Sequence, residues 1–108
     1  MGLDRLNDDD YPVWTMGQAA ELLDVEPAFL RSLDATAVIR PHRSAGGHRR
    51  YSRRQLHVAA RMRALLDEGL TSSAASRILV LEDELAQARR EIAELERRRD
   101  GTEPGRRG

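Results

Sequence analysis

A strict heptad repeat of apolar residues near the C-terminus most constrains what this chain can fold into. Its apolar positions begin at Ile78 and follow at intervals of 3, 4, 3, 4 and 3 residues, with mostly glutamate and arginine between them. This spacing is typical of a coiled coil, in which one partner helix covers a narrow seam. We therefore predict a coiled-coil dimerisation helix over residues 78–99; the alternative is a helix packed on its own domain. The predicted interface residues are Ile78, Leu81, Leu85, Ala88, Ile92 and Leu95.

The composition excludes several classes of protein. The chain has 108 residues and no cysteine, which rules out disulfides and thiolate metal sites. No apolar run is long enough to cross a bilayer, so we expect a cytoplasmic, nucleoid-associated protein.

The spacing of His42, His48 and His57 matches no metal-ligand pattern. Ser44 and His48 lie close together in the sequence but lack an orienting acid. We therefore expect no enzyme activity, no cofactor and no metal site.

Capping signals predict four short helices before the heptad region. Thr15 opens a T-x-x-Q capping box and Ser52 opens an S-x-x-Q box, each followed by apolar residues at helical spacing. Pro27 fits the first position of the second helix, which should end near residues 34–37. The third helix should run from Ser52 to about residue 68, and Thr71 should cap the fourth. The first two helices and their tight turn form a helix-turn-helix candidate.

The net charge of zero hides a strongly basic segment. Residues 1–39 carry eight acids and two arginines, residues 40–63 carry eight arginines and no acid, and residues 64–108 carry ten acids and eight arginines. Such a block indicates contact with a polyanion. The alternative is a solvated basic loop that pairs with the acidic N-terminal helices.

The centre of this segment is the basic hairpin, IRPHRSAGGHRRYSRR, residues 39–54. Residues 38–41 read as a short extended piece, residues 44–47 as a turn and residues 48–51 as the return strand. Arginine guanidinium groups pair bidentately with phosphate oxygens. The hairpin is therefore predicted to hold the DNA backbone.

The order of these motifs resembles the MerR family of bacterial transcription regulators. The resemblance is carried by TMGQAAELLDVEPAFLRSLDATAVIRP, GGHRRYS and LLDEGLTSSAASRIL, and covers residues 13 to about 97. Ser32 and Leu33 replace the paired aromatic residues of the family. Because no effector domain follows the dimer helix, the chain is similar to short members such as heat-shock repressors of the HspR type.

The resemblance implies a mainly α fold, with a winged helix-turn-helix domain (residues 13–77) followed by the dimerising helix. We expect a flexible acidic arm over residues 1–12 and a disordered tail over residues 100–108. The helix starting at Pro27 would enter the major groove of double-stranded DNA, and the wing would hold phosphates. The predicted DNA-contacting residues are Thr15, Ala28, Phe29, Arg31, Arg40, Arg43, His48, Arg49, Arg50, Tyr51 and Arg53.

These features predict a homodimeric, sequence-specific transcription regulator acting on palindromic promoter sites, with RNA polymerase or a regulatory protein as a further partner. A protein-interaction adaptor and an excisionase-like architectural DNA-binding factor are the alternatives. The sequence does not distinguish activation from repression.

Overall fold

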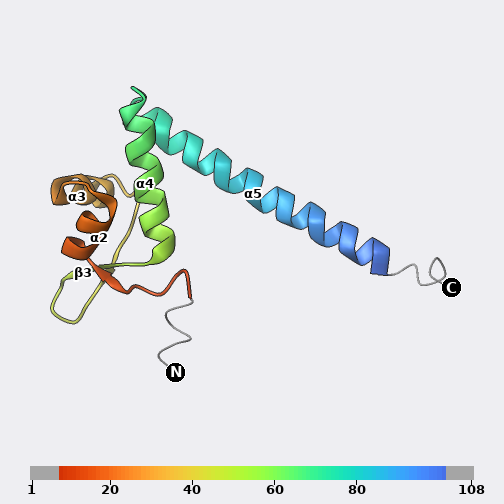
Figure 1. Cartoon of the computed structure of the whole chain (residues 1–108), viewed down its shortest axis with the longest axis horizontal. Coiled ribbons are helices and arrows are strands. Elements are labelled where there is room, and N and C mark those ends of the chain that lie inside the picture. The colour runs from red at the N-terminus through yellow and green to blue at the C-terminus, as the bar shows by residue number, and fades with distance from the viewer. Residues whose placement is uncertain (1–7, 102–108) are drawn as a thin grey trace. The chain divides into compact units, whose positions relative to one another are not determined.

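The computed structural model describes residues 8–101 and confirms the predicted fold class, with short helices and a small sheet preceding one long helix (Figure 1). The described residues form two compact units, which divide between Ser76 and Arg77. The elements in chain order are β1 (Trp14–Thr15), α2 (Met16–Leu23), α3 (Pro27–Ala35), β2 (His42–Arg43), β3 (Arg49–Tyr51), α4 (Arg53–Asp67) and α5 (Ser72–Gly101).

Both predicted capping boxes are present. Gln18 donates its backbone N–H to Thr15 Oγ1 at 3.1 Å, and Thr15 donates its own to Gln18 Oε1 at 3.0 Å. Ser52 and Gln55 repeat this exchange at 3.1 and 3.0 Å. Each box satisfies donors that the first turn of a helix leaves without partners, which fixes where α2 and α4 begin. As predicted, Pro27 opens α3.

The end of α3 is a Schellman turn closed by a residue with a left-handed backbone. Ala37 has φ of 64° and donates its N–H to the carbonyl oxygen of Asp34 at 3.0 Å, while Val38 donates to that of Leu33 at 2.9 Å. Glycine is the usual residue at this position, because a Cβ atom costs free energy at positive φ. The turn redirects the chain from α3 toward the wing.

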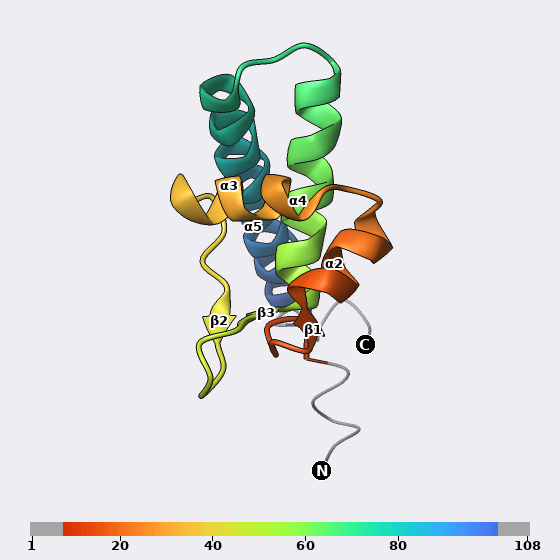
Figure 2. The same cartoon turned by 90° about the vertical axis from the view of Figure 1, so that its left-hand side faces the viewer.

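The sheet has the strand order β1-β3-β2 and is antiparallel throughout (Figure 2). Trp14 pairs with Tyr51 on one side of β3, and Arg43 pairs with Arg49 on the other. The predicted extended piece at residues 38–41 is wrong in position, because the strand is His42–Arg43. The N–H groups of residues 38 and 39 instead bond to the end of α3. Strand β1 was not predicted.

The core of the first unit lies where the helices and β3 pack together. Leu30, Tyr51 and Met62 are its largest fully buried side chains, and they come from α3, β3 and α4. Burying a side chain of this size contributes about 1.5–3 kcal/mol to folding. The other buried apolar residues are Ala19, Ala20, Leu33, Ile39, Leu56, Ala59, Leu65 and Ala75. This packing makes α3 and the wing parts of one body.

The two ends of the described chain differ from the sequence-based expectations. Asp9, within the predicted flexible arm, accepts the N–H of Arg54 through its carbonyl oxygen at 2.9 Å. Val13, just after the arm, donates its N–H to the Tyr51 carbonyl at 3.0 Å. The fourth helix and the heptad helix form one continuous helix, α5. Residues 1–7 and 102–108 lie outside the described residues. In the described part, no helix is long and apolar enough to cross a membrane.

Candidate nucleic-acid interface

An ion-pair cluster ties the wing (residues 42–51, comprising β2, its turn and β3) to α3. Asp34 Oδ2 lies 2.8 Å from Arg49 Nε and 3.2 Å from an Nη atom of Arg43. Arg43 also donates to the carbonyl oxygen of Gly47 at 3.1 Å. One carboxylate therefore partly neutralises two arginines predicted to contact DNA, and fixes the direction of both side chains.

Two aspartates that precede β1 form ion pairs with the start of α4. Arg53 lies 3.5 Å from Asp9, and Arg54 Nε lies 2.6 Å from Asp10 Oδ1. The alternative considered from sequence, pairing of the basic loop with the acidic N-terminal helices, holds for Arg43 and Arg49, which pair with Asp34 of α3. Asp9 and Asp10 lie before β1 and outside these helices. The segment with eight arginines and no acid is less electropositive in three dimensions than in sequence.

Three of the arginines predicted to contact DNA have no ion pair among the described residues. Arg40 and Arg31 are exposed, and Arg50 is half-buried in β3. Arg31 extends from α3 toward α2, where its Nη1 atom lies 3.7 Å from the sulfur of Met16. These side chains are the cations best able to contact an external anion, because no carboxylate in the described part of the chain neutralises them.

A hollow of about 330 Å³ lies between the start of α2 and the wing. Its lining residues are Thr15, Met16, Gly17, Gly47, His48, Arg49 and Arg50. None of these residues is acidic. The first turn of α2 adds backbone N–H groups, which favour anions at a helix N-terminus. A phosphate-sized anion would therefore meet both guanidinium groups and backbone donors.

Tyr51 is a core residue, and its burial gives no support to the predicted direct DNA contact. Its side chain is 1% exposed, and its hydroxyl oxygen has no hydrogen-bond partner in the described structure. Burial raises the pKa of this phenol, opposed in part by the nearby guanidinium group of Arg49. Tyr51 thus anchors β3 of the wing by packing its side chain in the core.

Phe29 and Thr15 also have structural roles. The guanidinium carbon of Arg63 lies 4.7 Å from the centre of the half-buried Phe29 ring, a cation–π contact between α3 and α4. The Thr15 hydroxyl caps α2, although the residue also lines the hollow. Ala28 is exposed on the first turn of α3.

The structure therefore brings together four of the predicted residues, Thr15, His48, Arg49 and Arg50, at the hollow. Arg40, Ala28 and Arg53 do not line it. All three histidines are exposed, and residues 8–101 contain no group of three histidine or carboxylate side chains able to hold a metal ion.

Sequence reasoning missed the carboxylates that organise the basic residues. Asp34 follows Leu33 at the end of α3, and Asp8–Asp10 form one of the two runs of three acids in the chain, the other being residues 82–84. The acid count of residues 1–39 signalled possible partners for the arginines. Which acid meets which arginine depends on the α3 turn and the sheet register, and neither is readable from composition.

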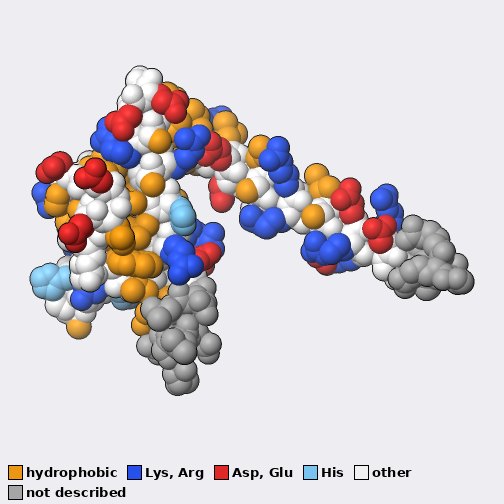
Figure 3. All heavy atoms as spheres, viewed as in Figure 1, with side chains coloured by type: hydrophobic (Ala, Val, Ile, Leu, Met, Phe, Trp, Pro, Cys, Tyr) orange, Lys and Arg blue, Asp and Glu red, His pale blue; other side chains and the backbone are white. Residues whose placement is uncertain are grey.

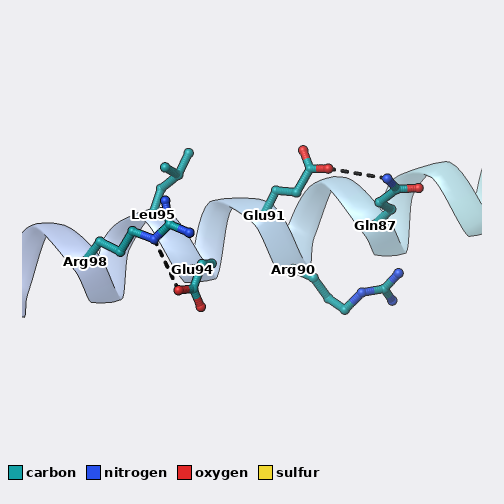
Figure 4. A pocket seen from close by; sticks show the side chains of 6 residues that line it. All are labelled: Gln87, Arg90, Glu91, Glu94, Leu95 and Arg98. Atoms are coloured by element: carbon teal, nitrogen blue, oxygen red, sulfur yellow. Dashed lines mark hydrogen bonds and ion pairs between the residues drawn. The ribbon is translucent and has the colours of Figure 1, made fainter.

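The seam residues predicted on α5 are exposed, except for Ile78, which is half-buried. Leu81, Leu85, Ile92 and Leu95 are 50–60% exposed, and hydrophobic side chains recur between charged ones along the helix (Figure 3). A hollow of about 390 Å³ on α5 combines Leu95 with polar and charged side chains, including Glu94 and Arg98, whose Nε–Oε2 distance is 3.3 Å (Figure 4). Charged residues thus flank the apolar seam.

Two helices joined by a turn, followed by a wing and a capped helix, define a winged helix-turn-helix protein. The family model described as "MerR HTH family regulatory protein" matches residues 14–81. The chain belongs to the MerR family, as its sequence motifs predicted.

One curated protein is similar in sequence, and two solved structures are similar in fold. "Putative heat shock protein HspR" of Streptomyces coelicolor is 35% identical over 94 residues, which are 86% of this chain and 62% of that protein. This chain thus spans about three-fifths of its relative's length. A MerR-family transcriptional regulator from Bacillus cereus is 25% identical with a TM-score of 0.58, covering 82% of this chain and 72% of that one. HiNmlR, a MerR-family regulator lacking the sensor domain and bound to promoter DNA, is 21% identical with a TM-score of 0.57, covering 81% and 78%.

Proposed function

We propose that this protein is a transcription regulator that binds double-stranded promoter DNA as a homodimer. The observation that carries the proposal is the acid-free hollow between α2 and the wing, where Arg49 and Arg50 meet the N-terminus of a helix. Guanidinium groups and helix N-terminal N–H groups are the donors that hold DNA phosphates. Membership of the MerR family supports this reading.

In this proposal, α3 contacts base edges and the wing binds the phosphate backbone of the DNA. Arg31 is exposed on α3, so it can reach the major groove. Arg50 lies on β3 and lines the hollow, where it can pair with a phosphate. Asp34 keeps these two elements in register, because its carboxylate binds wing arginines from α3.

The dimer is proposed to form through α5. The exposed leucines and isoleucine of its seam recur at coiled-coil spacing, and a second copy of the chain would cover them. A two-fold dimer presents its two winged domains to two half-sites, which favours a palindromic site. RNA polymerase or a regulatory protein is proposed as a further partner, in keeping with transcription control.

The DNA-binding proposal is tested by selecting duplexes from a random pool and measuring affinity for the enriched sequence over a range of salt. We expect an inverted repeat to be enriched. Arg50→Ala should weaken binding at low salt and reduce the slope of log K against log salt by about 1 per protomer. Arg97→Ala, which removes one charge from α5, is the matched control. Absence of any enriched sequence would contradict sequence-specific regulation and favour an architectural DNA-binding factor or an adaptor.

The dimer is tested separately by sedimentation. Leu85→Glu puts a charge into the seam and should convert the protein to monomers. Ala86→Glu makes the same addition at the neighbouring exposed position outside the seam and should leave a dimer. A Leu85→Glu variant that still sediments as a dimer would show that the seam is not the interface.

A further inference from the structure

The acidic segment Asp8–Asp10 occupies the basic start of α4. Asp9 Oδ1 lies 3.5 Å from Arg53 Nη1, and Asp10 Oδ1 lies 2.6 Å from Arg54 Nε. Asp9 also accepts the backbone N–H of Arg54 through its carbonyl oxygen at 2.9 Å. Asp8 shapes the segment, because its Oδ1 accepts the N–H of Asp10 at 2.9 Å. Two carboxylates are thus aimed at two adjacent guanidinium groups.

The donors used by this segment are of the chemical kind that DNA phosphates accept from. Arg53 and Arg54 are the first two residues of α4, so their side chains flank a helix N-terminus, where backbone N–H groups point outward. Phosphate oxygens and carboxylate oxygens both accept charge-assisted hydrogen bonds from arginine. A phosphate and the acidic segment therefore cannot both take the same donor positions.

The contacts are also weak enough to be exchanged. Arg54 and Asp10 are 61% and 69% exposed, and Arg53 and Asp9 are 46% and 52% exposed. Exposed ion pairs are screened by salt and contribute little stability. DNA carries a much denser line of negative charge than three aspartates, so it would displace the segment.

We propose that Asp9 and Asp10 form a built-in competitor that lowers the affinity of the protein for DNA and is displaced from Arg53 and Arg54 when a phosphate binds. This inference rests on the proposed DNA-binding function. It makes the segment before β1 a determinant of how tightly the regulator holds DNA. The same contact favours release from low-affinity sites, because a site with fewer phosphate contacts competes less well.

The test compares Asp→Asn variants. Each removes one negative charge per substitution, but only some of the replaced aspartates contact an arginine of α4. We expect Asp9→Asn with Asp10→Asn to bind a duplex of mixed sequence roughly three- to tenfold more tightly at low salt, with the difference shrinking as salt rises. Asp8→Asn is the matched control, because it removes one neighbouring charge and keeps the oxygen that accepts the Asp10 N–H. The quantity to compare is the increase in DNA affinity for each negative charge removed. If Asp8→Asn gives the same increase per charge as the double variant, the proposal is wrong, because the loss of negative charge near the DNA would then explain both results.

A second comparison asks whether the effect passes through the two arginines. In a protein carrying Arg53→Ala and Arg54→Ala, the aspartate substitutions should no longer tighten binding. A gain of the same size in that background would contradict direct competition. If Arg50→Ala weakens binding while the aspartate variants match the wild type, only the competitor is wrong. If no variant binds any duplex, the proposed function itself fails.

Discussion

Arg49 Nε lies 2.8 Å from Asp34 Oδ2, which joins the return strand of the wing to the last turn of α3 by a hydrogen-bonded ion pair. Both side chains are about three-quarters buried, at 24% and 22% exposure. The same oxygen also accepts from Arg43. The wing and α3 therefore share a charged contact as well as the apolar core, so that they keep one spacing relative to each other.

Asp34→Asn should lower the free energy of unfolding by about 1 kcal/mol, because it removes the charge that pairs with two arginines in a partly buried position. Urea unfolding at a fixed chain concentration, followed by the fluorescence of Trp14, the one tryptophan of the chain, measures the change. Asp67→Asn breaks the exposed pair with Arg63 and should change stability by less than about 0.5 kcal/mol. Equal effects of the two substitutions would mean that the Asp34 cluster is no stronger than a surface pair.

Ala37→Gly should stabilise the protein by roughly 0.5–1 kcal/mol. Ala37 has φ of 64°, where a Cβ atom is unfavourable, and this relief outweighs the extra freedom that glycine gives the unfolded chain. Ala35→Gly removes the same methyl group from the last helical residue and should be destabilising. Thermal unfolding by circular dichroism distinguishes the two, and a loss of stability at position 37 would show that the turn does not strain alanine.

We expect Tyr51 to make the free energy of unfolding fall in alkaline solution. Burial raises the pKa of its phenol above the ordinary value of 10.0, so above about pH 10 the unfolded chain loses this proton while the folded chain keeps it. Stability conferred by the neutral phenol is thus present below pH 10 and lost as the pH rises. The chain has no lysine or cysteine to add titrations in this range.

Tyr51→Phe should flatten this alkaline loss, and at neutral pH it should be neutral or stabilising, because the buried hydroxyl has no hydrogen-bond partner. Denaturant midpoints at pH 7 and across pH 9–11 measure both effects. Tyr11→Phe is the control and leaves the buried phenol in place. An unchanged alkaline slope in Tyr51→Phe would exclude this phenol as the cause.

Local signals predicted the helices of this protein well, because their determinants lie within three or four residues of one another. The boxes at Thr15 and Ser52 fixed the starts of α2 and α4 within a residue. The sheet was less predictable, because β1 exists only through its pairing with β3, 35 or more residues away along the chain. The charge cluster at Asp34 depends on the pairing of β2 with β3, which sets Arg43 opposite Arg49. Sequence thus identified the basic hairpin, whereas the structure identified which of its arginines are already paired.

Ser52→Ala should destabilise the protein by about 1–2 kcal/mol, more than Thr71→Ala. Both residues cap a helix, since Thr71 Oγ1 accepts the N–H of Ala74 at 3.1 Å. Ser52, however, is buried, and its partner Gln55 also donates to the Arg40 carbonyl at 2.8 Å, which connects the cap to the segment entering the wing. Removing a buried acceptor leaves a donor unsatisfied, whereas water replaces an exposed one. Urea unfolding of both variants measures the difference, and equal losses would show that the buried cap contributes nothing beyond its helix.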